Sequence, residues 1–142
     1  MKPVFLIDTN VAINLLAKRE PFWRSLAAIF DLAEQQKTDA HVNVLTLVTV
    51  CYSLHSYYKV SRRNILDQFG MLTSYVRVAD GTARHVQLAM ASMFNDFEDA
   101  VIFYSTKSIN GISSIITRNT DGFLAADIPV LTSNQWLSTY SG

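Results

Sequence analysis

Cysteine is almost absent from this 142-residue sequence, in which Cys51 stands alone. A single cysteine cannot form a disulfide within the chain or build a zinc site of several thiolates. Proteins without disulfides are typical of reducing compartments, so we expect a cytoplasmic protein. The Cys51 side chain itself is expected to be a small buried apolar group.

Long apolar runs are also missing. No segment approaches the roughly 20 consecutive apolar residues that a membrane-spanning helix needs. The apolar stretch from Pro3 to Ile7 is shorter than the core of a signal peptide. We therefore expect a protein that is neither exported nor held in a membrane. With 49% hydrophobic and 17% charged residues, the composition excludes a disordered chain.

An excess of charge is absent as well, because 12 basic side chains balance 12 acidic ones. Proteins that hold long nucleic acids usually carry a basic excess that neutralises phosphates. Neutrality therefore leaves room for a short site, a contact made through a metal ion, or a basic partner. No glycine-rich phosphate loop occurs, which argues against nucleotide-dependent transfer.

The sequence has neither a repeat nor a linker, so we expect a single domain over residues 1–142. Short apolar or alternating segments predict strands at residues 4–7, 41–44, 75–78, 112–117 and 129–131. Amphipathic segments between them predict helices, and the expected helix starts carry capping side chains: Thr46, Ser61, Asp80 or Thr82, Asp96, Ser133. This alternation is typical of an α/β fold with a parallel sheet covered on both faces.

Acidic side chains gather where these elements are expected to meet. Asp8 directly follows the first strand, and Asn119 and Asp121 lie in the loop after the fourth. Asp96 and Asp99 share one face of the helix that precedes the fourth strand. With right-handed crossovers all these segments reach the same edge of the sheet, where ligands of parallel sheets bind.

Clustered carboxylates repel one another unless a cation neutralises them. Oxygen ligands without cysteine or paired histidine select Mg²⁺ or Mn²⁺. Such an ion activates water and stabilises charge on a phosphoryl oxygen, so the pattern favours phosphodiester hydrolysis. The alternative is that Asp8, Asp96 and Asp99 only cap helices, with Glu98 as a solvated acid of the first turn.

These motifs resemble those of the PIN-domain family along nearly the whole chain. Residues 6–11 (LIDTNV) are similar to its first motif and residues 96–100 (DFEDA) to its third. Residues 116–119 (ITRN) with 121–123 (DGF) are similar to its fourth, and residues 129–132 (PVLT) to its closing strand. The resemblance implies a three-layer α/β/α sandwich around a parallel sheet of about five strands.

The resemblance also implies an endoribonuclease that depends on Mg²⁺ or Mn²⁺. Many small bacterial members are VapC-type toxins, often dimeric, each paired with an antitoxin protein. Carried over by position, the metal ligands are Asp8, Asp96, Asp99, Asn119 and Asp121, of which Asp8 and Asp99 bind directly and Asn119 or Asp121 through water. The catalytic residues are Asp8, Asp99 and Asp121, and the residues expected at the RNA are Asn10, Thr49 and Arg118.

Two departures from the family pattern bear on activity. PIN nucleases usually carry a glutamate early in the helix after the second strand, where this sequence has Thr49. A hydroxyl supplies no charge, so metal affinity should fall, with Asp96 as a candidate substitute. Gly122 holds the usual place of the fourth-motif aspartate, and Asp121 precedes it. The rival function is therefore a PIN fold with weak or no catalysis that binds RNA or a protein partner.

The histidines and the aromatic segment have other expected roles, and a phosphatase is disfavoured. The spacing of His41, His55 and His85 is not that of metal ligands, and structural or surface roles are expected for each. The aromatic segment 52–58 is expected to pack in the core or in a homodimer, with stacking on RNA bases as the alternative. An aspartyl phosphatase would need a second aspartate where Asn10 stands.

Overall fold

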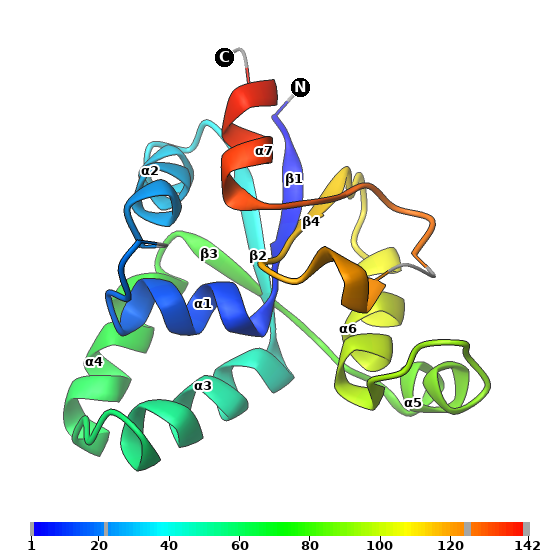
Figure 1. Cartoon of the computed structure of the whole chain (residues 1–142), viewed down its shortest axis with the longest axis horizontal. Helices are drawn as coiled ribbons and strands as arrows, with labels where there is room; N and C mark the ends of the chain where they lie inside the picture. The colour runs from blue at the N-terminus through cyan, green and yellow to red at the C-terminus, as the bar shows by residue number, and fades with distance from the viewer. Residues whose placement is uncertain (1, 22, 124–125, 141–142) are drawn as a thin grey trace.

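A computed structural model describes residues 2–21, 23–123 and 126–140 and shows an all-parallel sheet (Figure 1). Its strands run in the order β3-β2-β1-β4-β5. Their bounds are β1 Val4–Ile7, β2 Asp39–Asn43, β3 Val76–Ala79, β4 Ser114–Ile116 and β5 Val130–Leu131. The wholly apolar β1 lies in the centre, as its sequence predicts. The predicted parallel α/β sheet is confirmed.

Helices form a layer on each face of the sheet (Figure 1). One layer holds α1 (Thr9–Leu16), α2 (Trp23–Glu34), α3 (Val44–Ser56), α4 (Arg62–Thr73) and α7 (Ser133–Thr139). The other holds α5 (Ala83–Met90) and α6 (Phe97–Lys107), followed after β4 by the short 3-10 helix η1 (Thr120–Phe123). Alternate residues of β1 serve the two layers, since Phe5 and Ile7 pack with the first and Leu6 with the second. The three-layer sandwich is confirmed.

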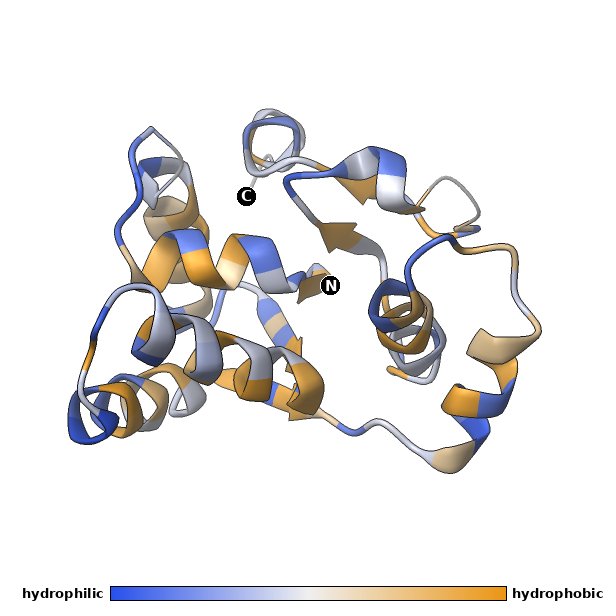
Figure 2. Ribbon diagram, turned by 60° about the horizontal axis from the view of Figure 1, so that its bottom comes forward, coloured by the Kyte–Doolittle hydropathy of each residue, from blue (hydrophilic) through white to orange (hydrophobic). Residues whose placement is uncertain are grey.

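The helices are amphipathic, with apolar and polar residues in turn along each ribbon (Figure 2). In α2 the predicted apolar stripe is buried through Leu26, Ile29, Phe30 and Ala33, whereas Phe22 lies outside the described residues. Within the described part of the chain, no helix is both long and apolar enough to cross a membrane.

The start of α3 differs from the sequence prediction. The Asn43 side chain accepts a hydrogen bond from the Leu45 N–H at 2.9 Å, so α3 begins at Val44 and not after a Thr46 cap. Asn43 is fully buried and also donates to the Ser105 hydroxyl of α6 at 2.7 Å. Because the cap is Asn43, Thr46 lies inside the helix, where its hydroxyl is available to neighbouring elements.

Most other helix starts agree with their predicted caps. Ser61 caps α4 and Asp96 caps α6, and of the two candidates for α5 it is Thr82 that caps the helix. The closing helix is capped by Thr132, one residue before the predicted Ser133, because Thr132 and Gln135 form a reciprocal capping box.

The carboxyl ends of β1 and β4 lie side by side, at the point where the strand order reverses. The Asp8 N–H donates to the Ile116 carbonyl at 2.9 Å, and the Thr117 hydroxyl donates to Asp8 Oδ2 at 2.8 Å. Residues after both strands therefore meet at one edge, which is where open parallel sheets bind their ligands.

Candidate functional site

Asp8 is the most buried acid of this edge, with 3% of its surface exposed. Its Oδ2 atom accepts the hydrogen bond from Thr117, whereas Oδ1 is buried and has no hydrogen-bond partner among the described residues. Burial raises the pKa of the Asp8 carboxyl, and the Thr117 bond opposes that rise. The side chain makes no capping bond to α1, so the capping alternative does not explain it. An unpaired buried carboxylate oxygen is costly unless a proton or a cation accompanies it.

Asp99 lies half-buried in the first turn of α6. Burial, with the neighbouring charges of Asp8, Asp96 and Glu98, raises its pKa to about 7. The charge of Asp8 thus acts on Asp99, and the pKa values of both carboxyls are raised; we refer to Asp8 and Asp99 as the acidic pair. The sequence predicts that the segments after β1 and before β4 lie at one edge, and these two acids come from those segments.

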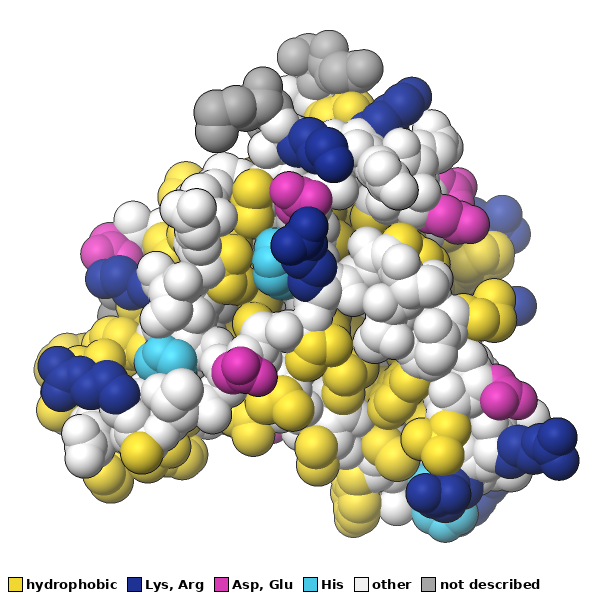
Figure 3. All heavy atoms as spheres, turned by 180° about the vertical axis from the view of Figure 1, so that it is seen from behind, with side chains coloured by type: hydrophobic (Ala, Val, Ile, Leu, Met, Phe, Trp, Pro, Cys, Tyr) yellow, Lys and Arg dark blue, Asp and Glu magenta, His cyan; other side chains and the backbone are white. Residues whose placement is uncertain are grey.

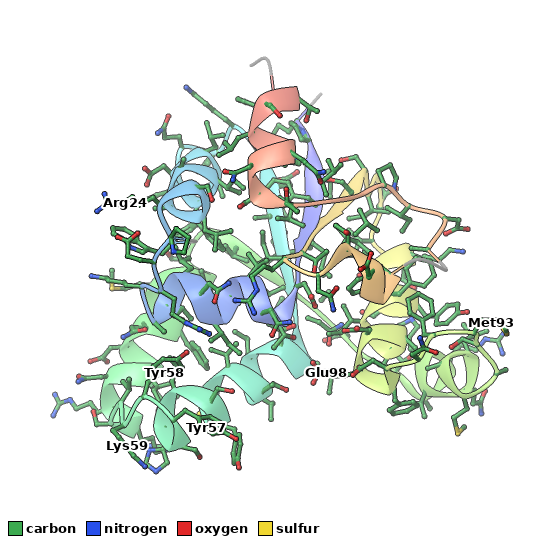
Figure 4. All side chains as sticks on the ribbon, in the orientation of Figure 1. Arg24, Tyr57, Tyr58, Lys59, Met93 and Glu98 are labelled. Atoms are coloured by element: carbon green, nitrogen blue, oxygen red, sulfur yellow. The ribbon has the colours of Figure 1, made fainter. Side chains whose placement is uncertain are left out.

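Glu98 differs from its sequence prediction as a solvated acid. Its Oε1 atom accepts a hydrogen bond from the Thr49 hydroxyl of α3 at 2.9 Å. Its Oε2 atom accepts one from the Thr9 hydroxyl of α1 at 3.3 Å, and that hydroxyl also pairs with Thr46 at 3.0 Å. In Figure 4 Glu98 lies between α6 and the start of α3. The side chain therefore points into the fold and joins three helices.

Asp96 has the capping role that the alternative prediction gave it. Its Oδ1 atom accepts a hydrogen bond from the Asp99 N–H at 2.9 Å, and the residue is exposed. Glu98, not Asp96, contacts Thr49, the residue in the place of the usual PIN glutamate.

The fourth-motif loop turns a glycine toward the acidic pair. A Cβ atom on Gly122 would lie 3.0 Å from Asp99 Oδ2 and 3.6 Å from Asn119 Nδ2. Both residues predicted to serve the metal from this loop, Asn119 and Asp121, are exposed. Asn119 is the one whose side chain lies beside Gly122, next to Asp99.

The three residues predicted at the RNA are spread around the site. Thr49 lies within it, through its bond to Glu98. Asn10 is exposed at the start of α1. The Arg118 Nη1 atom donates to Asn14 Oδ1 of α1 at 3.2 Å, so its guanidinium is turned toward α1.

Two carboxylates, rather than three, are available for direct metal ligation. Among the described residues, no three His, Cys, Asp or Glu side chains are arranged to hold one ion. Mg²⁺ is commonly bound by one or two carboxylates with water completing its shell. The unpaired Oδ1 of Asp8 and the raised pKa of Asp99 fit a hydrated divalent cation at the acidic pair.

Sequence reasoning placed Thr49 at the site, as a residue expected at the RNA, but missed Thr9, Thr46 and Thr117. All four hydroxyl groups hydrogen-bond within the site, directly to a carboxylate or to one another. The available signal was the pair Thr46 and Thr49, which lie on one face of the otherwise apolar first two turns of α3.

A family model for the PIN domain matches residues 4–121, which include the acidic pair and the first two residues of η1. The chain belongs to the PIN-domain family. PIN domains are generally nucleases, so the family assigns the broad class of hydrolases acting on nucleic acids. No curated protein matches the sequence.

Solved PIN-like structures share the fold. A toxin–antitoxin complex from Klebsiella pneumoniae is 22% identical, with a TM-score of 0.62, over 90% of this chain and 96% of that chain. VapBC2 from Rickettsia felis, bound to a DNA fragment from its promoter, is 14% identical with a TM-score of 0.59 over the same shares. PAE2754 from Pyrobaculum aerophilum is 14% identical with a TM-score of 0.63, over 96% of this chain and 88% of that one. Identities this low establish the shared fold alone.

Proposed function

We propose that this PIN domain is an endoribonuclease that hydrolyses RNA phosphodiester bonds with Mg²⁺ or Mn²⁺. The observation that carries the proposal is the acidic pair at the β1–β4 edge, in which Asp8 Oδ1 is buried without a partner. A buried carboxylate oxygen without a partner, at the ligand-binding edge of a parallel sheet, suits a divalent cation.

Asp8 and Asp99 would hold the ion. The Asn119 side chain would lie near it, because Asn119 and Asp99 both border Gly122. When bound, a divalent cation supplies a more acidic water and positive charge for a phosphoryl oxygen. Thr117 fixes the Asp8 carboxylate by its hydrogen bond, so that Oδ1 keeps one orientation. The half-buried Asp99 is the nearer of the two acids to solvent and hence to an incoming phosphate.

A short single-stranded substrate suits the charge of this protein. The net charge is zero, and on the face seen in Figure 3 basic and acidic side chains are interspersed. Without a basic surface, affinity for a long duplex would be low at physiological salt. A single strand can bring one phosphate to the acidic pair without such a surface.

Cleavage of RNA by purified protein with Mn²⁺, Mg²⁺ or a chelator tests this proposal. Asp8→Asn and Asp99→Asn preserve side-chain shape, and each should lower the cleavage rate by about 100-fold or more, since even outer-shell partners of a metal contribute 10–100-fold. Asp67→Asn, an exposed acid of α4, makes the same change away from the site and serves as control. Cleavage that survives in chelator, or in Asp8→Asn, would refute the metal-dependent mechanism.

The rival function is a PIN fold that binds RNA or a protein partner without cleavage. Two observations favour it: no three acidic, His or Cys side chains converge among the described residues, and Gly122 carries no acid. It requires that folded wild-type protein cleave none of a diverse set of RNAs at any Mn²⁺ concentration while still binding one of them or a partner.

We also propose an antitoxin partner and a homodimer. The support for the antitoxin is that two of the structures sharing this fold are toxin–antitoxin complexes. The support for the homodimer is an exposed apolar stripe on α3 and the turn after it, where Val48, Tyr52 and Tyr57 are 66%, 63% and 73% exposed. Growth arrest on expression, relieved by a neighbouring gene, tests the first. Sedimentation of wild type against Val48→Ser/Tyr52→Ser tests the second, and a wild-type monomer would refute the dimer.

A further inference from the structure

We infer that Glu98, in the first turn of α6, is a third acid of the metal site and acts on the bound ion through water. The inference rests on the proposed function, because it concerns the same site. It adds Glu98, which the sequence predicts to be a solvated acid of the first turn.

Glu98 is held in a fixed position by donors from two other helices. Each of its carboxylate oxygens accepts one hydroxyl hydrogen bond, Oε1 from Thr49 at 2.9 Å and Oε2 from Thr9 at 3.3 Å. Thr46 in turn pairs with Thr9 at 3.0 Å and is fully buried. Ordering a long side chain costs conformational entropy, so a solvated surface acid would not adopt this arrangement without such partners.

An acid at a helix start commonly caps the helix or forms a surface ion pair, and Glu98 does neither. The capping role belongs to Asp96, which accepts the Asp99 N–H at 2.9 Å. A surface ion pair is also excluded, because the ion pairs formed by the described residues use Asp39, Glu20 and Asp127 as their acids. Glu98 is therefore a positioned carboxylate whose charge has no basic partner in the described part of the chain.

The charge of Glu98 acts on both members of the acidic pair. It is among the charges that raise the pKa of Asp8 and of Asp99. Charge repulsion from Glu98 on Asp8 and Asp99 is unfavourable without a cation, the more so because Asp8 has a buried oxygen without a partner. A cation removes that repulsion, and each further acid that faces it increases the attraction.

The arrangement of the acids favours an indirect contact between Glu98 and the ion. In the described ranges no three His, Cys, Asp or Glu side chains are grouped to hold one ion, so we place Glu98 beyond the direct ligands, on a water of the hydrated cation. Thr49 and Thr9 occupy one lone pair on each oxygen and leave others free to accept from that water. Partners of this kind typically change metal affinity by about 10–100-fold.

This arrangement gives Thr49 a function. Thr49 stands where PIN nucleases usually carry a glutamate on α3, and it cannot supply the charge itself. Its hydroxyl instead donates a hydrogen bond to the Glu98 carboxylate of α6. The acid is thus on α6 and not on α3, and it still supplies negative charge beside Asp8 and Asp99.

Thermal melting at increasing Mn²⁺ concentrations tests the inference without measuring cleavage. A ligand that binds the folded state raises Tm in step with its concentration, so the titration reports affinity for Mn²⁺. Glu98→Gln keeps the size and an acceptor oxygen but removes the charge, and should shift the titration to about 10–100-fold higher Mn²⁺. Glu34→Gln makes the same change at an exposed acid at the end of α2 and should match wild type.

Two further variants separate charge from structure. Thr49→Val keeps the Glu98 charge but removes the donor that fixes it, and should shift the titration less than Glu98→Gln does. The double variant Thr49→Glu/Glu98→Gln returns the acid to α3 and should recover Mn²⁺ affinity. A purely structural Glu98 would give no such recovery.

The outcomes distinguish this inference from the proposed function. If wild type shows no Mn²⁺-dependent rise in Tm, the metal site itself is refuted. If wild type responds, Asp8→Asn does not, and Glu98→Gln responds like Glu34→Gln, then the metal site stands and the role of Glu98 is refuted. Should Glu98→Gln fail to fold, Thr49→Val decides: a titration shifted to higher Mn²⁺ supports the role of Glu98, and a titration like that of Glu34→Gln refutes it.

Discussion

The two sides of the site differ in how their polar groups are held. On the side formed by the ends of β1 and β4 with α1, α3 and α6, hydroxyl groups hydrogen-bond to Asp8 and Glu98. On the side formed by η1, Asp121 is exposed and Gly122 presents no side chain to Asp99. The first side, which we call the ordered side, therefore carries carboxylates fixed by hydrogen bonds. On the second, which we call the open side, Gly122 leaves space beside Asp99. The difference indicates that this PIN domain concentrates its acids on the α6 side.

The largest expected effect comes from breaking the ordered side at Thr117. Thr117→Val keeps the shape of the side chain but removes the hydrogen bond to Asp8 Oδ2. Both carboxylate oxygens would then be buried without partners, so unfolding free energy should fall by about 1–3 kcal/mol. Denaturant unfolding in chelator measures it, with Thr120→Val in η1 as the matched change. A loss below the error of that measurement would show that Thr117 does not hold Asp8.

An acid added to the open side should make the two sides alike. Gly122→Asp places a carboxylate beside Asp99, because its Cβ would lie 3.0 Å from Asp99 Oδ2. Repulsion should lower the unfolding free energy in chelator by about 1–2 kcal/mol, and Mn²⁺ should restore it. Gly122→Ala measures the steric part alone, which Mn²⁺ should not restore. If both variants respond to Mn²⁺ as wild type does, the open side does not face the ion.

The smallest expected effect is the pH dependence caused by Asp99. Its pKa rises from the ordinary value of 3.8 to about 7 in the folded chain. Between these values the folded state binds more protons than the unfolded state, so the stabilising contribution of the protonated carboxyl is lost as pH rises toward 7. Asp8, whose pKa is also raised, acts in the same direction.

Asp99→Asn removes this dependence. In chelator at pH 8 the variant should melt about 2–3 °C above wild type, a modest gain because water screens a half-buried group. The difference should be smaller at pH 5 and vanish only below the ordinary pKa of 3.8, and Mn²⁺ at pH 8 should reverse the order of the two proteins. Wild type that gains stability from pH 5 to pH 8 in chelator, relative to Asp99→Asn, would contradict the raised pKa.

Much of the fold follows from local sequence patterns. The apolar run Val4–Ile7 gave the central strand with its bounds correct, and Ser61 and Asp96 gave two helix starts. The start of α3 could not be read in this way, since Asn43 and Thr46 are both good caps. Asn43 prevails because it is fully buried and also contacts Ser105 of α6, a partner that no local pattern reveals.

The sequence by itself determined the alternation of strands and helices, and with it the edge at which Asp8 and Asp99 meet. Periodicity reports which face of an element is buried, and the order of parallel elements brings their carboxyl ends to one edge. Only the tertiary structure decided which acids turn inward. Glu98 finds its partners 49 residues away at Thr49 and 89 residues away at Thr9. Contacts over such separations depend on how helices pack across the sheet, so spacing within the DFEDA motif could not distinguish Glu98 from Asp96.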